Sequence, residues 1–238
     1  IYGAKAAPHV IAALKLSEPV VDRIFTTLGM GWDTNSGFPG TIYRREVLLT
    51  YTNRFYLPEY RKFLEPTLEN VRRVTAEKDS VLTDIGRMFS ELEAARPDLK
   101  PAQYDELNTR FEWLRGVARE NRELEIAYWR YRYLRHLYAL RDTDPAQLAQ
   151  IAAAYDSVRT YRADLFQFRD DQRFSAWDLP LGGVDRIRHI GLGNPEPLMK
   201  EIYDESKKYV EEIAGPAEAG DTAQARVAGR TTSAAPGG

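Results

Sequence analysis

The sequence predicts an all-α fold, and three features of the chain favour it. Long stretches repeat apolar residues at three- and four-residue spacing, as a helix with a buried face requires. Proline follows a capping residue at several places, which is typical of a helix start. Alternating β-branched runs are few, and no Asn-Gly or Asp-Gly pair joins two of them. We therefore expect a multi-helix bundle with a long central helix.

The periodic stretches predict the positions of individual helices. They are expected over residues 5–16, 18–29, 42–56, 59–95, 101–141, 145–170 and 195–214. Ser17 is a candidate N-cap for the second helix, and Asp144 followed by Pro145 is one for the sixth. Gly215 is placed to end the last helix. The second half of 59–95 is the weakest part of the pattern because Gly86 interrupts it.

Two glycine-rich loops and a polar tail complete the predicted organisation. The loops cover residues 28–40 and 174–197, and loops of this length in compact domains are usually functional. Residues 215–238 are small and polar, so they cannot bury enough surface to offset the entropy of ordering them. We expect one helical domain over 1–214 and a disordered tail over 215–238.

The most conspicuous stretch is "AYWRYRYLRHLYALR" (127–141), in which aromatic residues alternate with arginines. A helical wheel of residues 122–141 places the apolar side chains on two opposite faces. One face holds Leu124, Ala127, Tyr131, Leu134 and Tyr138, and the other holds Ile126, Trp129, Tyr133, Leu137 and Leu140. A nucleic-acid-binding helix would instead collect its basic residues on one exposed side. The pattern favours a central helix packed on two sides, with arginines along the seams pairing with carboxylates.

Composition narrows the classes of function. A net charge of −2 lacks the basic excess of a nucleic-acid-binding protein, and no run reaches the roughly eighteen apolar residues of a membrane span. The absence of cysteine removes thiolate chemistry, and His9, His136 and His189 lack metal-ligand spacing. We expect no metal, no cofactor, no nucleic acid and no membrane partner, in a soluble protein of the cytoplasm or periplasm. Because the chain begins with Ile1, we expect a processed protein or a piece of a longer one.

Candidate site residues lie in the glycine-rich loops. Trp32 and Asp33 stand in "GWD", and "AWD" at 176–178 repeats the pair, as Trp177 and Asp178, in the second loop. Sugar sites stack an aromatic face on the ring while acids and amides, here Asp33 and Asn35, take the hydroxyls. Two acids across a cleft could also serve glycoside hydrolysis. The alternative is that both tryptophans anchor their loops on the core. The charged stretch 59–79 is most simply a solvated surface.

Three stretches resemble a known family. They are "YGAKAAPHVIAALKLSEPVV" (2–21), "TLGMGWDTNSGFPG" (27–40) and "FEWLRGVARENRELEIAYWRYRYL" (111–134). Together they are similar to the helical C-terminal region of α-glucuronidase-like glycoside hydrolases, which follows a large catalytic barrel. The second loop, 174–197, has no counterpart in this resemblance.

The resemblance implies a non-catalytic role for this chain. In that family the acid and base carboxylates sit on the upstream (β/α)₈ barrel, and a barrel needs about 200 residues or more of alternating strand and helix. Trp32, Asp33 and Asn35 would then wall the substrate cleft or support a homodimer. The expected partners are the barrel of the same polypeptide, an oligosaccharide and a second copy. Two alternatives stay open: a stand-alone protein-interaction module that uses both loops, and a helical oligosaccharide-binding protein.

Overall fold

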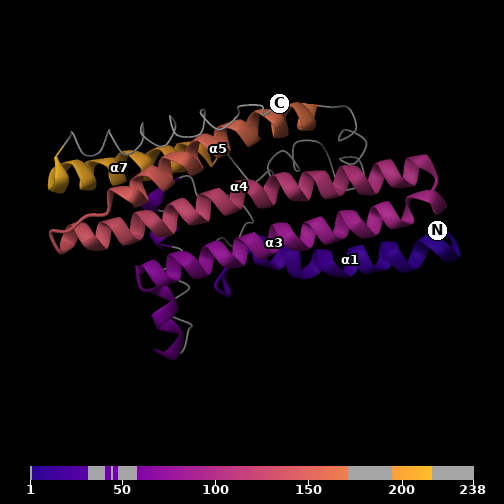
Figure 1. Cartoon of the computed structure of the whole chain (residues 1–238), viewed down its shortest axis with the longest axis horizontal. Coiled ribbons are helices and arrows are strands. Elements are labelled where there is room, and N and C mark those ends of the chain that lie inside the picture. The colour runs from indigo at the N-terminus through magenta and orange to yellow at the C-terminus, as the bar shows by residue number, and fades with distance from the viewer. Residues whose placement is uncertain (1, 32–40, 44, 48–57, 171–194, 216–238) are drawn as a thin grey trace, which may run out of the picture.

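A computed structural model describes residues 2–31, 41–43, 45–47, 58–170 and 195–215, and its fold is all-α as predicted (Figure 1). The elements are α1 (Gly3–Phe25), β1 (Thr26–Thr27), β2 (Met30–Gly31), η1 (Pro58–Leu64), α3 (Leu68–Ala95), η2 (Arg96–Asp98), α4 (Pro101–Ala139), α5 (Pro145–Asp170) and α7 (Glu196–Ala214). None of the described helices is long and apolar enough to cross a membrane.

The long helices pack side by side. α1 lies against α3, α3 against α4, and α4 against both α5 and α7 (Figure 1). One apolar core follows these contacts and takes residues from each of these α-helices. Val10, Ile85, Leu124, Ile151 and Ile202 represent α1, α3, α4, α5 and α7 in it, and each is at most 1% exposed. α1 is therefore at one edge of the bundle, with α3 as its main neighbour.

The central position predicted for the aromatic stretch is confirmed. In α4, Tyr131 is buried and stacks between Tyr128, with ring centroids 6.4 Å apart, and Tyr209 of α7, at 6.1 Å. On the opposite side Trp129 is fully buried. The second apolar face stops short of the end of the helix, because Leu140 is 64% exposed. α4 is thus covered on two sides, and Tyr128, Trp129 and Tyr131 are core residues.

The N-terminal region is one helix, so the predicted break at Ser17 is wrong. α1 runs through Pro19, and the Ser17 hydroxyl donates to the Leu14 carbonyl at 2.7 Å instead of capping a new helix. Proline removes one backbone hydrogen bond. The two halves nevertheless share one buried face, which continues from Val10 before the proline to Ile24 after it. Packing of that face on α3 holds the helix together across the proline.

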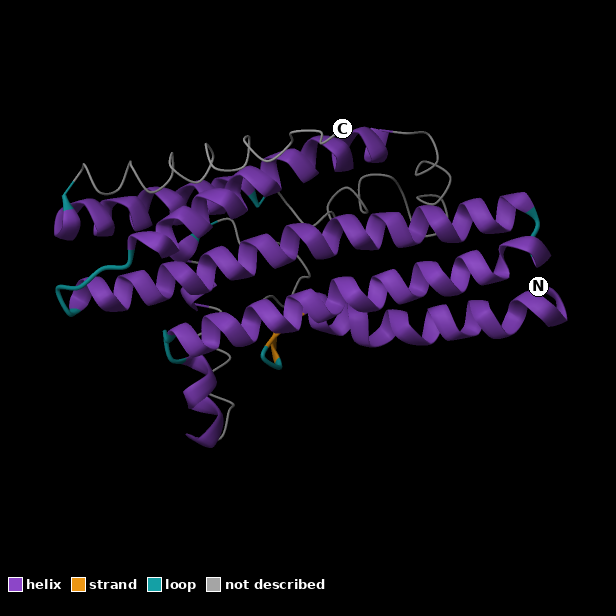
Figure 2. Ribbon diagram, viewed as in Figure 1, coloured by secondary structure: helices purple, strands orange, loops and turns teal. Residues whose placement is uncertain are grey.

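The same helix ends earlier than predicted. It stops at Phe25, and the chain forms a small antiparallel hairpin in which Thr26 pairs with Gly31 and Thr27 with Met30 (orange in Figure 2). Leu28 and Gly29 form the turn with φ of 52° and 75°. Two positive φ angles are what a two-residue hairpin turn requires, but leucine is a poor residue for the first of them.

The predicted helix 59–95 is divided in two. η1 ends at Leu64, and α3 begins after Pro66 with Thr67 as its N-cap, whose hydroxyl accepts from the Asn70 N–H at 3.2 Å. The weak point expected at Gly86 does not interrupt α3, because apolar residues on both sides of it remain buried. Of the predicted helix 42–56, the described residues 42, 43 and 45–47 are helical, and the rest lies outside the described residues.

The last predicted helices agree with the structure. Asp144 caps α5 by accepting from the Ala146 N–H at 3.1 Å, and Gly215 ends α7 with φ of 87°. Most of the loop 174–197 and residues 216–238 lie outside the described residues, so the expected disordered tail stays a prediction.

Replacing Tyr131 with alanine tests the central position of α4. Tyr131 is 3% exposed, so truncation removes a buried ring and its two stacking contacts. We expect the free energy of unfolding to fall by about 3–5 kcal/mol, measured by urea denaturation. Leu140→Ala, at the C-cap residue of the same helix, is the control and should change the free energy of unfolding by about 0.5 kcal/mol or less, because Leu140 is 64% exposed. A loss below about 1 kcal/mol for Tyr131→Ala would contradict its burial.

Candidate functional site

The predicted site residues Trp32, Asp33 and Asn35 lie outside the described residues, as do Trp177 and Asp178. The structure therefore neither brings the two tryptophan–aspartate pairs together nor separates them. What it does describe is the chain on both sides of residues 32–40. The hairpin precedes this segment, and the turn 41–47, which is helical at its described residues 42, 43 and 45–47, follows it.

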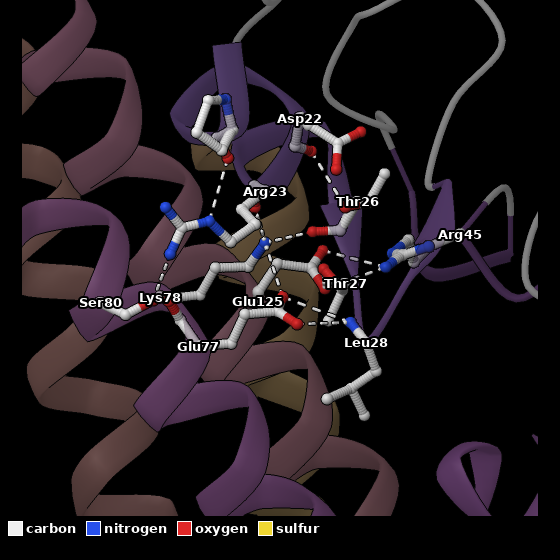
Figure 3. A network of polar contacts seen from close by, with 11 residues as sticks. Asp22, Arg23, Thr26, Thr27, Leu28, Arg45, Glu77, Lys78, Ser80 and Glu125 are labelled. Atoms are coloured by element: carbon white, nitrogen blue, oxygen red, sulfur yellow. Dashed lines mark hydrogen bonds and ion pairs between the residues drawn. The ribbon is translucent and has the colours of Figure 1, made fainter. Parts of the chain in front are cut away.

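Lys78 of α3 holds the point where α1 becomes the hairpin (Figure 3). Its ammonium Nζ donates to the carbonyl oxygens of Arg23, at 2.6 Å, and Thr26, at 2.5 Å. The last carbonyls of a helix have no partner within the helix, and a positive charge near that end is favourable. Lys78 is 1% exposed. It thus acts as a buried cap on the C-terminus of α1.

Glu77, the neighbour of Lys78, holds the hairpin turn. Its two carboxylate oxygens accept from the Leu28 N–H at 3.0 and 3.2 Å. A non-glycine residue with a left-handed backbone costs on the order of 1–3 kcal/mol and persists only where the surroundings enforce it. The charge-assisted hydrogen bond to Glu77 is one contact that keeps Leu28 in this conformation.

Glu125 of α4 connects the two sides of the 32–40 segment. Its Oε2 accepts from the Thr27 hydroxyl at 2.8 Å, before the segment. Arg45, after the segment, donates from one guanidinium nitrogen, Nη2, to both carboxylate oxygens at 2.9 and 3.0 Å. Glu125, Arg45 and Thr27 are each at most 2% exposed, and Figure 3 shows the carboxylate between its partners.

The helical turn 41–47 has further partners on α7 and α4. Its start is held by Glu201 of α7, whose carboxylate accepts from the Ile42 N–H at 2.8 Å. Farther along the turn, Glu46 accepts from the Tyr128 hydroxyl at 2.6 Å and lies 3.6 Å from Arg132. Burial raises the pKa of Tyr128, so its hydroxyl stays protonated and keeps donating. The turn is therefore tied to two helices besides its contact with Glu125.

The buried cluster is balanced in charge. It has two cations, Arg45 and Lys78, and two carboxylates, Glu77 and Glu125. Burial alone would raise the pKa of Glu125, but the charges of Arg45 and Lys78 and the hydrogen bonds from Thr27 and Arg45 together outweigh burial, and the net shift of the pKa is downward. Burial lowers the pKa of Lys78, although both carboxylates oppose this, and it raises the pKa of Glu77. Glu125 is thus the ionised centre of the cluster.

The geometry of the cluster suits positioning rather than catalysis. Glu125 is 0% exposed, so its carboxylate cannot reach a substrate in solution. Lys78 and Glu77 form hydrogen bonds with backbone groups of residues 23–28. Among the described residues, no group of three or more His, Cys, Asp or Glu side chains could hold a metal ion. What the arrangement can do is fix the backbone on both sides of residues 32–40.

The sequence contained one signal for this cluster. Stretch 59–79 is not simply a solvated surface, because Lys78 of that stretch is buried. Along α3 the buried positions Val71, Val74, Lys78, Val81 and Ile85 alternate three- and four-residue steps, so Lys78 stands within the apolar seam. A lysine at such a position indicates a buried cation with a partner. Nothing in the sequence identified Glu125 or Arg45 as members of the same buried cluster.

Comparison of the chain with protein-family models, with curated proteins and with solved structures finds no match.

Replacing Glu125 with glutamine tests the cluster and its charge. The change keeps the shape but leaves Arg45 and Lys78 without the shared carboxylate, which should cost about 3–5 kcal/mol of unfolding free energy at pH 7. The folded-state pKa of Glu125 lies below its usual 4.5, so ionised Glu125 stabilises the fold above that pH. This stabilisation is lost as the pH falls through the folded-state pKa. The difference between wild type and Glu125→Gln should therefore shrink below pH 4.5.

Urea denaturation at several pH values measures this difference. Glu106→Gln is the matched control, since Glu106 pairs with Arg110 on the surface and both side chains are 52% exposed. It should change the stability by about 1 kcal/mol or less at every pH. We call the contacts of Glu125 with Thr27 and Arg45 the clamp. The clamp would be contradicted if Glu125→Gln lowered the stability as little as the control does, or if its loss of stability grew in acid.

Proposed function

We propose that this chain is a non-catalytic helical domain of a polysaccharide-degrading glycosidase. In this proposal the bundle packs on a catalytic barrel carried upstream in the same polypeptide. Trp32, Asp33 and Asn35 then contribute to the wall of the substrate cleft: the indole ring stacks on a sugar, and the carboxylate and amide bond its hydroxyls. The substrate class is a plant-derived oligosaccharide with uronic acid groups, as the family resemblance implies.

The observation that carries the proposal is the attachment of both sides of residues 32–40 to one side chain. Glu125 accepts from Thr27 before the segment and from Arg45 after it. Substrate contacts depend on position, because a misplacement of about 1 Å can cost a large part of their effect. A buried, charge-balanced clamp on both sides of a short segment supports a role in which the placement of that segment matters.

An exposed tyrosine beside the segment adds to this support. Tyr43 is 77% exposed, although most large aromatic residues in the described part of the chain are at least partly buried. Its neighbour Arg45 is fixed in the clamp, so Tyr43 extends from an anchored turn. An exposed aromatic ring on a rigid support is a suitable surface for stacking on a sugar ring. Sequence reasoning did not single out Tyr43.

A stand-alone protein-interaction module is the second candidate. Tyr43 and Val47 are one helical turn apart, and they are 77% and 46% exposed. A pair of exposed apolar side chains at this spacing is also what a helix presents to a protein partner. The two candidates differ in one consequence. Only the first requires the fluorescence of Trp32 to change when an oligosaccharide binds.

Titration with aldouronic oligosaccharides tests the proposed function. Tryptophan fluorescence of the wild-type chain should be quenched in a saturable way, because the sugar covers the Trp32 ring. In Trp32→Ala the quench should disappear, and in Tyr43→Ala the dissociation constant should rise by about tenfold, the effect of losing roughly 1.4 kcal/mol.

Trp113→Phe is the control, because Trp113 of α4 packs against the core and is not one of the candidate site residues. It should keep the quench and the affinity. Circular dichroism confirms that each variant keeps the helical fold. Absence of saturable quenching, or quenching that survives in Trp32→Ala, would count against the sugar role and leave the protein-interaction module as the better candidate.

A further inference from the structure

α1 carries a second apolar stripe, on the side that does not face the core. Ile11, Leu14 and Val21 are 51%, 45% and 40% exposed. With Ala7 and Phe25, which are partly buried, and Glu18, which is exposed, they form the series 7, 11, 14, 18, 21, 25. Steps of four and three residues alternate along it. This is the spacing of a seam that packs against another helix.

The inner face of α1 is already covered. Ala6, Val10, Ala13, Val20 and Ile24 are buried, mostly against α3. A helix that is apolar on two sides normally lies between two other elements. α4 satisfies this rule within the chain, whereas α1 lies at the lower edge of the bundle in Figures 1 and 2 with α3 on one side.

We propose that the α1 stripe is a homodimer interface, in which α1 of a second copy packs antiparallel. A two-fold axis at Leu16 places Ile11 opposite the partner's Val21 and Ala7 opposite the partner's Phe25. Each contact then occurs twice, as a two-fold interface requires. The proposal does not depend on the proposed function, because no residue of the stripe belongs to the segment 32–40.

Charge determines the orientation of the second copy. Lys15 and Glu18 are both exposed and lie on either side of the proposed axis. In the antiparallel arrangement Leu14 lies opposite the partner's Glu18, so Lys15, the next residue, lies beside that carboxylate, and the reverse pair forms at the same time. A parallel arrangement would place Glu18 against the partner's Glu18 in the centre of the seam. Antiparallel packing also opposes the two helix dipoles. The stripe is thus complementary to itself in one orientation only.

The size of the stripe indicates a reversible dimer. One helix face buries less than the roughly 800 Å² per partner of a standard stable interface. The wild-type chain should therefore dissociate on dilution, with a dissociation constant in the range of about 1–100 μM. Sedimentation equilibrium measures this as a mass that rises with concentration from the 27.2 kDa of the chain towards twice that value.

Charge reversal gives the sharpest test. Lys15→Glu and Glu18→Lys each place like charges across the axis, so each variant alone should dimerise at least about tenfold more weakly than wild type. Mixing the two variants restores both pairs, because Glu at 15 of one chain faces Lys at 18 of the other. The mixture should regain the wild-type dissociation constant, and so should the double variant.

Apolar variants test the seam itself. Leu14→Glu should abolish the dimer, whereas Leu140→Glu, a change at the 64% exposed leucine that follows α4, should leave it unchanged. Circular dichroism checks that both variants keep their helices. A monomer at all concentrations would overturn the proposal, as would dimerisation unaffected by Leu14→Glu. Failure of the mixed charge variants to dimerise would overturn the antiparallel arrangement.

Discussion

The buried carboxylate of Glu125 is the contact on which the arrangement around residues 26–47 depends. It joins α4 to Thr27 in β1 and to Arg45 in the helical turn 41–47, and it lies near Lys78 of α3. Four parts of the chain that are distant in sequence therefore meet at one charge. Removing any one of the charged partners leaves another charge buried without its counterpart, which is costly in a protein interior.

Backbone geometry explains why this core position holds charges. Replacing a buried ion pair by well-packed apolar residues is often neutral or stabilising. Here, however, the change from helix to hairpin after Phe25 leaves backbone groups that need partners. Lys78 bonds the carbonyls of Arg23 and Thr26, and Glu77 bonds the Leu28 N–H. Apolar replacements would leave these groups unsatisfied, so the charges serve the backbone that leads into residues 32–40.

Sequence patterns predicted those elements that are determined by residues close together in the sequence. The two apolar faces of α4 and the Asp144 cap of α5 could be identified because periodicity and capping act within a few residues. The continuation of α1 through Pro19 could not, because it depends on packing against α3. The positive φ of Leu28 depends on Glu77, forty-nine residues away in sequence. The same holds for the site. The burial of Lys78 could be predicted from its position within the apolar seam of α3, whereas its partners are brought together only by the fold.

Hydrogen exchange measured by mass spectrometry tests most directly whether Glu125 holds both sides of residues 32–40. Peptides covering 24–31 and 41–47 are compared between wild type and Glu125→Gln, with peptides of α5 as the internal reference. If one carboxylate fixes both sides, exchange in both peptides should accelerate together while exchange in α5 stays unchanged. Acceleration in only one of the two peptides, or in neither, would contradict the claim.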